Sequence, residues 1–297
     1  MSPLPAPFPP LVADGEGLDR YPDAPLTLAS RMAEVYGVPA DSVLPVRGVT
    51  HGLELVWRGA ARDGAAVQAP DAEPYRTLAA LYAPPAAGAP VSAVIVRGSG
   101  SPEAVAEMAE RVAPALLVVD EGLAEFADAP SAATVIADRP NLVVLRSLSL
   151  AYGLAGARVG AALGWPETLA RLAAVMEPWA LPAVSVRLAL QALDPSRLIE
   201  TTERIAAVRR ERQRLAEALA REMTVEPGVG PVLVALVLLW PLLFKAWRRA
   251  RPRTAAAVAG GTVAGGPAAA GSTADRPPAD RPTASDATPA NHGQEKS

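Results

Sequence analysis

Two polar side chains stand where apolar runs of the chain end. Asp120 closes the run ALLVVD, and Ser147 closes the run NLVVLRS. Apolar runs of this length, alternating with amphipathic segments, predict an α/β fold with a largely parallel sheet. Ligands of such a sheet bind beyond the carboxyl ends of its strands, so we expect both residues at a binding edge. The alternative for Asp120 is an acid that only caps the loop after its strand.

Side chains that could form covalent bonds or hold a metal are few. The chain has no cysteine, its only imidazoles are His51 and His292, and its only lysines are Lys245 and Lys296. Arginine stays protonated and does not supply the neutral amine that imine formation needs. Residues 1–244 therefore offer no lysine anchor for a carbonyl ligand, and no zinc or iron centre is expected.

Helix and strand patterns alternate from residue 26 to about residue 223. Ser-Pro-Glu at 101–103 is a favourable helix start. The predicted elements are helices at 26–36, from 48 and from 101, a short strand within 37–46, and strands at 91–97, 115–120, 141–147 and 159–163. The last three are predicted as buried parallel strands.

A long helix is predicted at 201–223, with Ile205, Val208, Leu215 and Leu219 on one face. Its other face carries Arg209, Arg210, Glu211, Arg212 and Arg214. We expect this charged face to be solvated, and a partner surface is the alternative.

Four segments, in this order, resemble histidinol-phosphate aminotransferases, which belong to the class I and II aminotransferases. They are DRYPD at 19–23, GVPADSVLPVRGVTHGLELVWR at 37–58, LLVVDEGLAEF at 116–126 and NLVVLRSLSLAYGLAGAR at 141–158. The resemblance spans roughly 19–223. It implies an aminotransferase-like three-layer domain with a mostly parallel central sheet, pyridoxal phosphate as cofactor, and amino transfer between histidinol phosphate and a 2-oxo acid.

The resemblance also implies roles for particular residues. Asp120 corresponds to the aspartate that binds the pyridine nitrogen, which keeps the ring protonated. Ser147, Ser149 and Arg158 correspond to the contacts of the cofactor phosphate, with Thr50 and the turn at Gly48 as a further element. Taken singly, each serine is also an ordinary turn or cap residue.

Leu150 stands where the family has the lysine that forms the Schiff base with the cofactor. If pyridoxal phosphate binds, we therefore expect it to bind non-covalently. The other departures are Leu123 in place of a tyrosine, RGSGSPE at 97–103 in place of the asparagine-rich loop, and Glu73 or Pro74 near the expected ring-stacking aromatic, where Tyr75 could serve only with a shift in register.

The predicted organisation is a Pro-rich segment at 1–18, a large domain at 19–200, a helix entering an incomplete small domain at 201–226, an apolar segment at 227–249 and a disordered tail at 250–297. The apolar stretch 229–244 is followed by basic residues and a tryptophan. It is interpreted either as a membrane helix or as a buried strand. A shifted reading frame near residue 236 is a further hypothesis.

These observations predict a catalytically impaired protein of the aminotransferase type. The alternatives are a non-catalytic protein that binds a phosphorylated ligand, a membrane-tethered pseudoenzyme, and a non-functional product. A net charge of −3 with dispersed basic residues predicts no nucleic-acid partner. The resemblance leaves a homodimer open, and the absence of a signal-peptide pattern predicts a cytoplasmic location.

Overall fold

The computed structural model describes Leu11 and residues 18–22, 24–82, 84–98, 100–127 and 129–219. The predictions for the apolar segment 227–249, including a membrane helix at 229–244, and for the tail at 250–297 lie outside these residues. So do the predicted small domain beyond residue 219 and nearly all of the Pro-rich segment. Within the described part of the chain, no helix has the length and hydrophobicity needed to cross a membrane.

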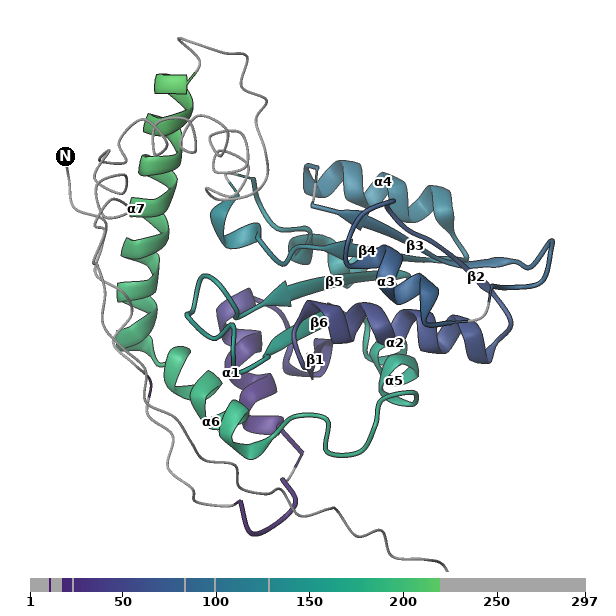
Figure 1. The fold of residues 1–297 in the computed structure, drawn as a ribbon, viewed down its shortest axis with the longest axis horizontal. Coiled ribbons are helices and arrows are strands. Elements are labelled where there is room, and N and C mark those ends of the chain that lie inside the picture. The colour runs from purple at the N-terminus through teal and green to yellow at the C-terminus, as the bar shows by residue number, and fades with distance from the viewer. Residues whose placement is uncertain are drawn as a thin grey trace, which may run out of the picture. The chain divides into compact units, whose positions relative to one another are not determined.

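A six-stranded sheet forms the centre of the described part (Figure 1). The strands lie in the order β1-β6-β5-β4-β3-β2. The neighbours from β2 to β5 run parallel, whereas β6 is antiparallel to both β5 and β1. The bounds are β1 Val43–Val46, β2 Ala66–Gln68, β3 Val91–Arg97, β4 Leu116–Asp120, β5 Leu142–Ser147 and β6 Gly160–Gly164. The predicted α/β fold with a mostly parallel sheet is confirmed.

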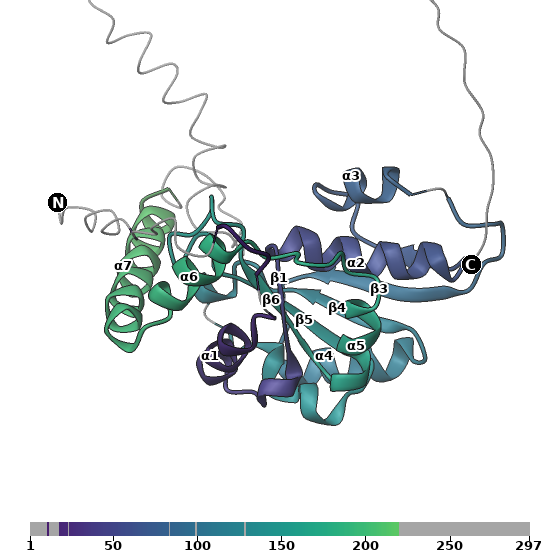
Figure 2. The same cartoon turned by 90° about the horizontal axis from the view of Figure 1, so that it is seen from below.

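Helices cover both faces of the sheet, which gives three layers (Figure 2). The helices of the described residues are α1 Leu26–Tyr36, α2 Val49–Arg62, α3 Tyr75–Ala80, α4 Pro102–Val112, α5 Pro166–Ala173, α6 Ala183–Ala192 and α7 Pro195–Leu219. Helix α1 and strand β3 have the bounds predicted from the sequence, 26–36 and 91–97. Helix α4 follows Ser101, whose Oγ accepts a hydrogen bond from the Ala104 amide at 3.3 Å, as expected of an N-cap.

Alternate residues of the central strands pack into two separate cores. Val118 on β4 packs with residues of α2, α3 and α5, including Leu53 and Trp57. Its neighbour Val119 packs in the other core with residues of α1 and α4, including Met32. Because successive strand side chains point to opposite faces, continuous apolar runs are what a sheet covered on both sides requires.

Strand β6 corrects the prediction that all three late strands run parallel. It is antiparallel to β5, with Ser147 opposite Gly160. A parallel return would need a crossover connection, usually a helix, whereas the segment between these two strands contains only turns. The strand also begins one residue later than predicted, at Gly160.

Helix α7 corrects the prediction for the charged face at 209–214. The guanidinium groups of Arg209 and Arg212 donate hydrogen bonds of 2.7 Å to the main-chain carbonyls of Glu125 and Phe126. These two arginines are half-buried, because the turn after β4 offers carbonyl oxygens beside the helix. Arg210 and Arg214 are exposed, as predicted. The helix also begins earlier than expected, at Pro195.

Candidate functional site

Asp120 and Ser147 lie at the carboxyl ends of β4 and β5, which are neighbours in the sheet. The structure therefore brings the two strand-end residues to one edge, as the sequence predicts. The backbone at Gly122 lies between them, since a Cβ there would be 3.1 Å from Asp120 Oδ1 and 3.9 Å from Ser147 Cβ. The start of α2 reaches the same place, because the same Cβ would be 3.2 Å from Val49 Cγ2.

The carboxylate of Asp120 is held by two donors. The Tyr75 hydroxyl donates a hydrogen bond to Oδ2 at 2.6 Å, and the Gly122 amide donates one to Oδ1 at 3.0 Å. Each carboxylate oxygen can accept more than one hydrogen bond, so the group keeps capacity for a further donor. Its orientation is thus defined without using all of its lone pairs.

Tyr75 is a site residue whose importance its local sequence does not indicate. Its side chain is 1% exposed. Burial and then the hydrogen bond to Asp120 raise its pKa, so the hydroxyl stays protonated and can donate. Its position in APDAEPYRT marks it as an aromatic of the right segment, but no local pattern indicates a partner 45 residues away.

Four residues form what we call the cup: Gly48, Ser147, Ser149 and Arg158. The Ser149 amide donates a hydrogen bond to Ser147 Oγ at 3.1 Å. Arg158 Nη1 donates to Ser149 Oγ at 3.4 Å and to the Ala155 carbonyl at 3.1 Å. The guanidinium lies against Gly48, where a Cβ would be 2.8 Å from Arg158 Nη2. The serines and the arginine selected from the sequence therefore meet at the start of α2.

The backbone of the cup needs glycine at two positions. Gly48 has a φ of 76°, in the region that side chains disfavour. Gly160, the first residue of β6, lies against Gly48. A Cβ on Gly160 would lie 3.0 Å from Gly48 Cα and 2.5 Å from the Arg146 carbonyl oxygen. Arg158 itself has a φ of 54°, a conformation that costs about 1–3 kcal/mol and often occurs at functional sites.

The first turn of α2 adds main-chain N–H groups to the cup. No side chain caps this helix start at Gly48. The His51 and Gly52 amides donate to the Gly48 carbonyl at 3.1 and 3.3 Å, and the N–H groups ahead of them lie at the positive end of the helix dipole, which favours an anion. Thr50 is exposed in this first turn, next to Val49. Thr50 thus lies at the N-terminal end of α2, and its role toward a phosphate stays a prediction.

Leu150 directly follows Ser149 of the cup, and its side chain is 49% exposed. The Gly153 amide donates a hydrogen bond to the Leu150 carbonyl at 3.4 Å, which closes a turn here. An exposed apolar side chain therefore occupies the position where the resemblance implies a lysine. Leu123, at the tyrosine position, is half-buried against the core on the α1 and α4 side.

A buried ion cluster lies behind the site, and no local sequence pattern indicates it. Arg146 donates to Glu121 Oε2 at 3.0 Å and to Glu125 Oε1 at 2.8 Å. Glu121 also accepts hydrogen bonds from the Ser131 hydroxyl at 2.5 Å and the Ala132 amide at 2.7 Å. Glu121 directly follows Asp120 and Arg146 directly precedes Ser147, so the cluster ties these two strand ends together.

Comparisons with known proteins show the family of this chain. The family model described as aminotransferase class I and II matches residues 100–238. Histidinol-phosphate aminotransferase of Stenotrophomonas maltophilia (strain R551-3) is 36% identical, with 70% of this chain and 67% of that protein covered. The chain belongs to the histidinol-phosphate aminotransferase family. The enzyme of Xanthomonas euvesicatoria pv. vesicatoria (strain 85-10) is 33% identical, with 68% of this chain and 65% of that protein covered.

Solved structures share the fold of this histidinol-phosphate aminotransferase family member. The histidinol-phosphate aminotransferase from Sinorhizobium meliloti, in complex with pyridoxal-5'-phosphate, gives a TM-score of 0.57 at 23% identity, covering 69% of this chain and 65% of that chain. L-threonine-O-3-phosphate decarboxylase from Porphyromonas gingivalis gives 0.58 at 20% identity, covering 68% and 72%. At these identities they show the fold alone. The chain spans about two thirds of the length of the curated relatives it matches.

Proposed function

We propose that this family member binds pyridoxal phosphate, or a phosphate ester of similar shape, without a covalent bond, and that it is impaired in amino transfer. The observation that carries this proposal is the pairing of an assembled cup with Leu150. Ser149 is hydrogen-bonded within the cup, while the next side chain is apolar and half exposed.

The described residues fit the phosphate and ring-nitrogen parts of such a ligand. Ser147, Ser149, Arg158 and the first N–H groups of α2 would hold the phosphate through charge-assisted hydrogen bonds. Asp120, oriented by Tyr75, would accept a hydrogen bond from the ring nitrogen. In the enzymes that use it, pyridoxal phosphate supplies an electron sink for carbanion stabilisation.

The same residues do not fit covalent attachment or proton transfer by a lysine. Leu150 offers no amine and no base, and residues 1–244 contain no lysine. General acid–base catalysis alone contributes about 10²–10⁴-fold in typical enzymes. The loop at 97–103 also lacks the asparagines that the resemblance implies for positioning the substrate. We therefore expect little or no amino transfer.

Isothermal titration calorimetry with matched ligands tests the proposal. Pyridoxal phosphate and pyridoxine phosphate should bind with similar affinity, because binding does not use the aldehyde, whereas pyridoxal without phosphate should bind far more weakly. Arg158→Gln should weaken both phosphate ligands about ten- to hundredfold, the worth of one hydrogen bond to a charged group. Arg111→Gln is the matched control, because Arg111 is in the last turn of α4 and pairs with Glu107.

Two outcomes would refute the proposal. One is equal binding of pyridoxal with and without its phosphate. The other is a pyridoxyl mass fixed by borohydride on a residue before 245 in the wild-type protein. Leu150→Lys with pyridoxal phosphate then tests the reason for the impairment. A fixed mass at position 150 with measurable amino transfer would show that only the amine is missing.

A further inference from the structure

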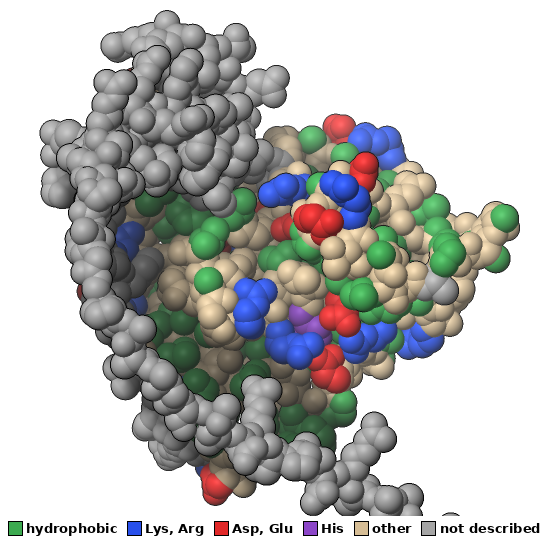
Figure 3. Space-filling view, viewed as in Figure 1, with side chains coloured by type: hydrophobic (Ala, Val, Ile, Leu, Met, Phe, Trp, Pro, Cys, Tyr) green, Lys and Arg blue, Asp and Glu red, His purple; other side chains and the backbone are tan. Residues whose placement is uncertain are grey.

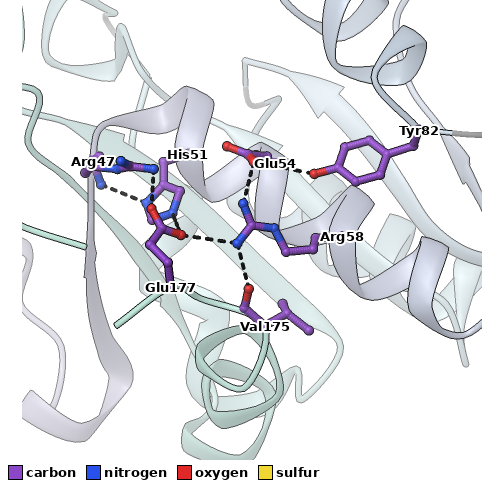
Figure 4. A network of polar contacts seen from close by, with 7 residues as sticks. All are labelled: Arg47, His51, Glu54, Arg58, Tyr82, Val175 and Glu177. Carbon is purple, nitrogen blue, oxygen red and sulfur yellow. Dashed lines mark hydrogen bonds and ion pairs between the residues drawn. The ribbon is translucent and has the colours of Figure 1, made fainter. Parts of the chain in front are cut away.

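His51 is buried in the third position of α2, beside the cup but turned toward another part of the chain. Its side chain is 3% exposed. Nδ1 accepts a hydrogen bond from the main-chain amide of Arg47 at 3.1 Å. Because Nδ1 acts as an acceptor, the ring proton belongs on Nε2, which lies 3.3 Å from Glu177 Oε2. Figure 4 shows the imidazole between these two partners.

The hydrogen bond from Arg47 to His51 closes the turn that carries Gly48. The Gly48 amide donates to the Val46 carbonyl at 2.8 Å on the strand side of the same turn. The turn is therefore fixed from both sides, by β1 and by the imidazole. Its conformation sets the direction of the first N–H groups of α2, which belong to the cup.

Charged groups surround His51 on its other side. Glu177, in the segment after α5, forms ion pairs with Arg47 and, at 3.2 Å, with Arg58. Arg58 also pairs with Glu54 at 2.5 Å, and both lie on α2. Figure 3 shows Lys or Arg side chains and Asp or Glu side chains gathered on one face of the molecule. These are the charged groups in the polar network of Figure 4, and they join α2 to the segment after α5.

We infer that His51 is a positioning residue for anion binding, which acts by holding the Arg47–Gly48 turn through Nδ1 and does not touch the ligand. This inference rests on the proposed phosphate binding at the cup. It assigns the two ring nitrogens separate tasks. Nδ1 shapes the turn, and Nε2 joins α2 to Glu177.

Protonation of His51 removes the acceptor, because a hydrogen on Nδ1 then faces the Arg47 amide. The turn should then loosen as the pH falls. Burial, and then the charge of Arg47, lower the pKa of His51 from its ordinary value of 6.5, while Glu177 opposes them. The acceptor is thus present at pH 8 and is lost only as the pH falls through this lowered pKa.

Two substitutions separate the two nitrogens. His51→Asn keeps an oxygen at the position of Nδ1 but does not reach Glu177. His51→Gln reaches toward Glu177 but has no acceptor at the position of Nδ1. Sulfate is the probe, because its charge stays constant between pH 5 and pH 8, and its affinity is measured by calorimetry.

At pH 8 we expect the wild-type protein and His51→Asn to bind sulfate alike, and His51→Gln to bind about three- to tenfold more weakly, the worth of one main-chain hydrogen bond. As the pH falls from 8 through the lowered pKa of His51, the wild type should lose affinity by a similar factor relative to His51→Asn. Equal affinities of the two variants, or the same pH profile in the wild type and His51→Asn, would overturn the inference and leave the proposed function standing.

A measurement without any anion completes the test. In NMR spectra, the amide proton of Arg47 should keep its hydrogen-bonded shift in His51→Asn and move upfield in His51→Gln. An unchanged shift in both variants would overturn the inference. If the wild-type protein binds neither sulfate nor phosphate at any pH, both the inference and the proposed function are wrong.

Discussion

Removal of Arg146 should strongly destabilise the fold. Its side chain is buried at 8% exposure, between Glu121 at 2% and Glu125 at 9%. The guanidinium also lies 4.9 Å from the centre of the Tyr36 ring. Arg146→Met replaces the charged guanidinium with a long apolar side chain. It leaves two buried carboxylates without their cation.

Removal of one partner of a buried ion pair typically costs about 3–5 kcal/mol, because the remaining charge is desolvated and unpaired. Here one cation serves two carboxylates, so we expect a loss in this range. Such a loss lowers the ratio of folded to unfolded protein by a factor on the order of 10²–10⁴. It is also a large part of the roughly 5–15 kcal/mol that stabilises a typical domain.

The assay is urea unfolding at pH 7.5 and at pH 5. Protonation of a buried carboxylate that has lost its cation removes the unpaired charge, so the penalty should shrink as the pH falls. Arg31→Met is the control, because Arg31 and Glu34 form an exposed pair worth about 1 kcal/mol or less.

Two results would refute this reasoning. One is a loss in Arg146→Met no larger than that in Arg31→Met. The other is a penalty that grows toward pH 5. The combination of Arg146→Met with Glu121→Gln and Glu125→Gln should recover much of the lost stability, because no buried charge then remains in the cluster.

Three further predictions follow from single contacts. Tyr75→Phe removes the hydroxyl that donates to Asp120. Calorimetry should then show about tenfold weaker binding of pyridoxine phosphate and unchanged binding of sulfate. An equal loss of affinity for both ligands would contradict a role of Asp120 toward the ring nitrogen. The pKa of His51 is lowered in the folded state, so on acidification the unfolded chain binds a proton at this histidine before the folded protein does. The free energy of unfolding should therefore fall as the pH drops below about 6.5, by at most ~1.4 kcal/mol per pH unit. Urea unfolding between pH 5 and pH 7.5 should show this component in the wild type and not in His51→Asn. Gly160→Ala should cost about 1–3 kcal/mol and weaken sulfate binding, because its Cβ would lie 2.5 Å from the Arg146 carbonyl oxygen. Gly156→Ala, where nothing lies within 4 Å, is its control in thermal unfolding, and equal losses in both variants would count against the close approach at Gly160.

Much of the sheet was predictable because its strands are continuous apolar runs. Strand β3 has the predicted bounds, and β4 and β5 end at the predicted residues Asp120 and Ser147. Their proximity was predictable as well, since neighbouring parallel strands end at the same edge. The direction of β6 was not, because an apolar run has the same composition in either direction.

The cup was predictable in part. Ser147, Ser149 and Arg158 lie within one segment of the chain, and the resemblance selects all three. Their meeting with Gly48 depends on the packing of β6 against the turn before α2, where Gly160 permits close approach. The half-burial of Arg209 on α7 likewise depends on a carbonyl of the turn after β4, which no helical periodicity indicates.

By itself, the sequence determined the alternation of strands and helices and the lack of a lysine before residue 245. These are properties of residue type and local order, so no coordinates are needed to establish them. Tertiary structure alone decided that Tyr75 holds Asp120 across 45 residues and that His51 meets Glu177 across 126. Such pairs are chosen by the packing of the elements that carry them, and local sequence patterns do not encode a partner at that distance.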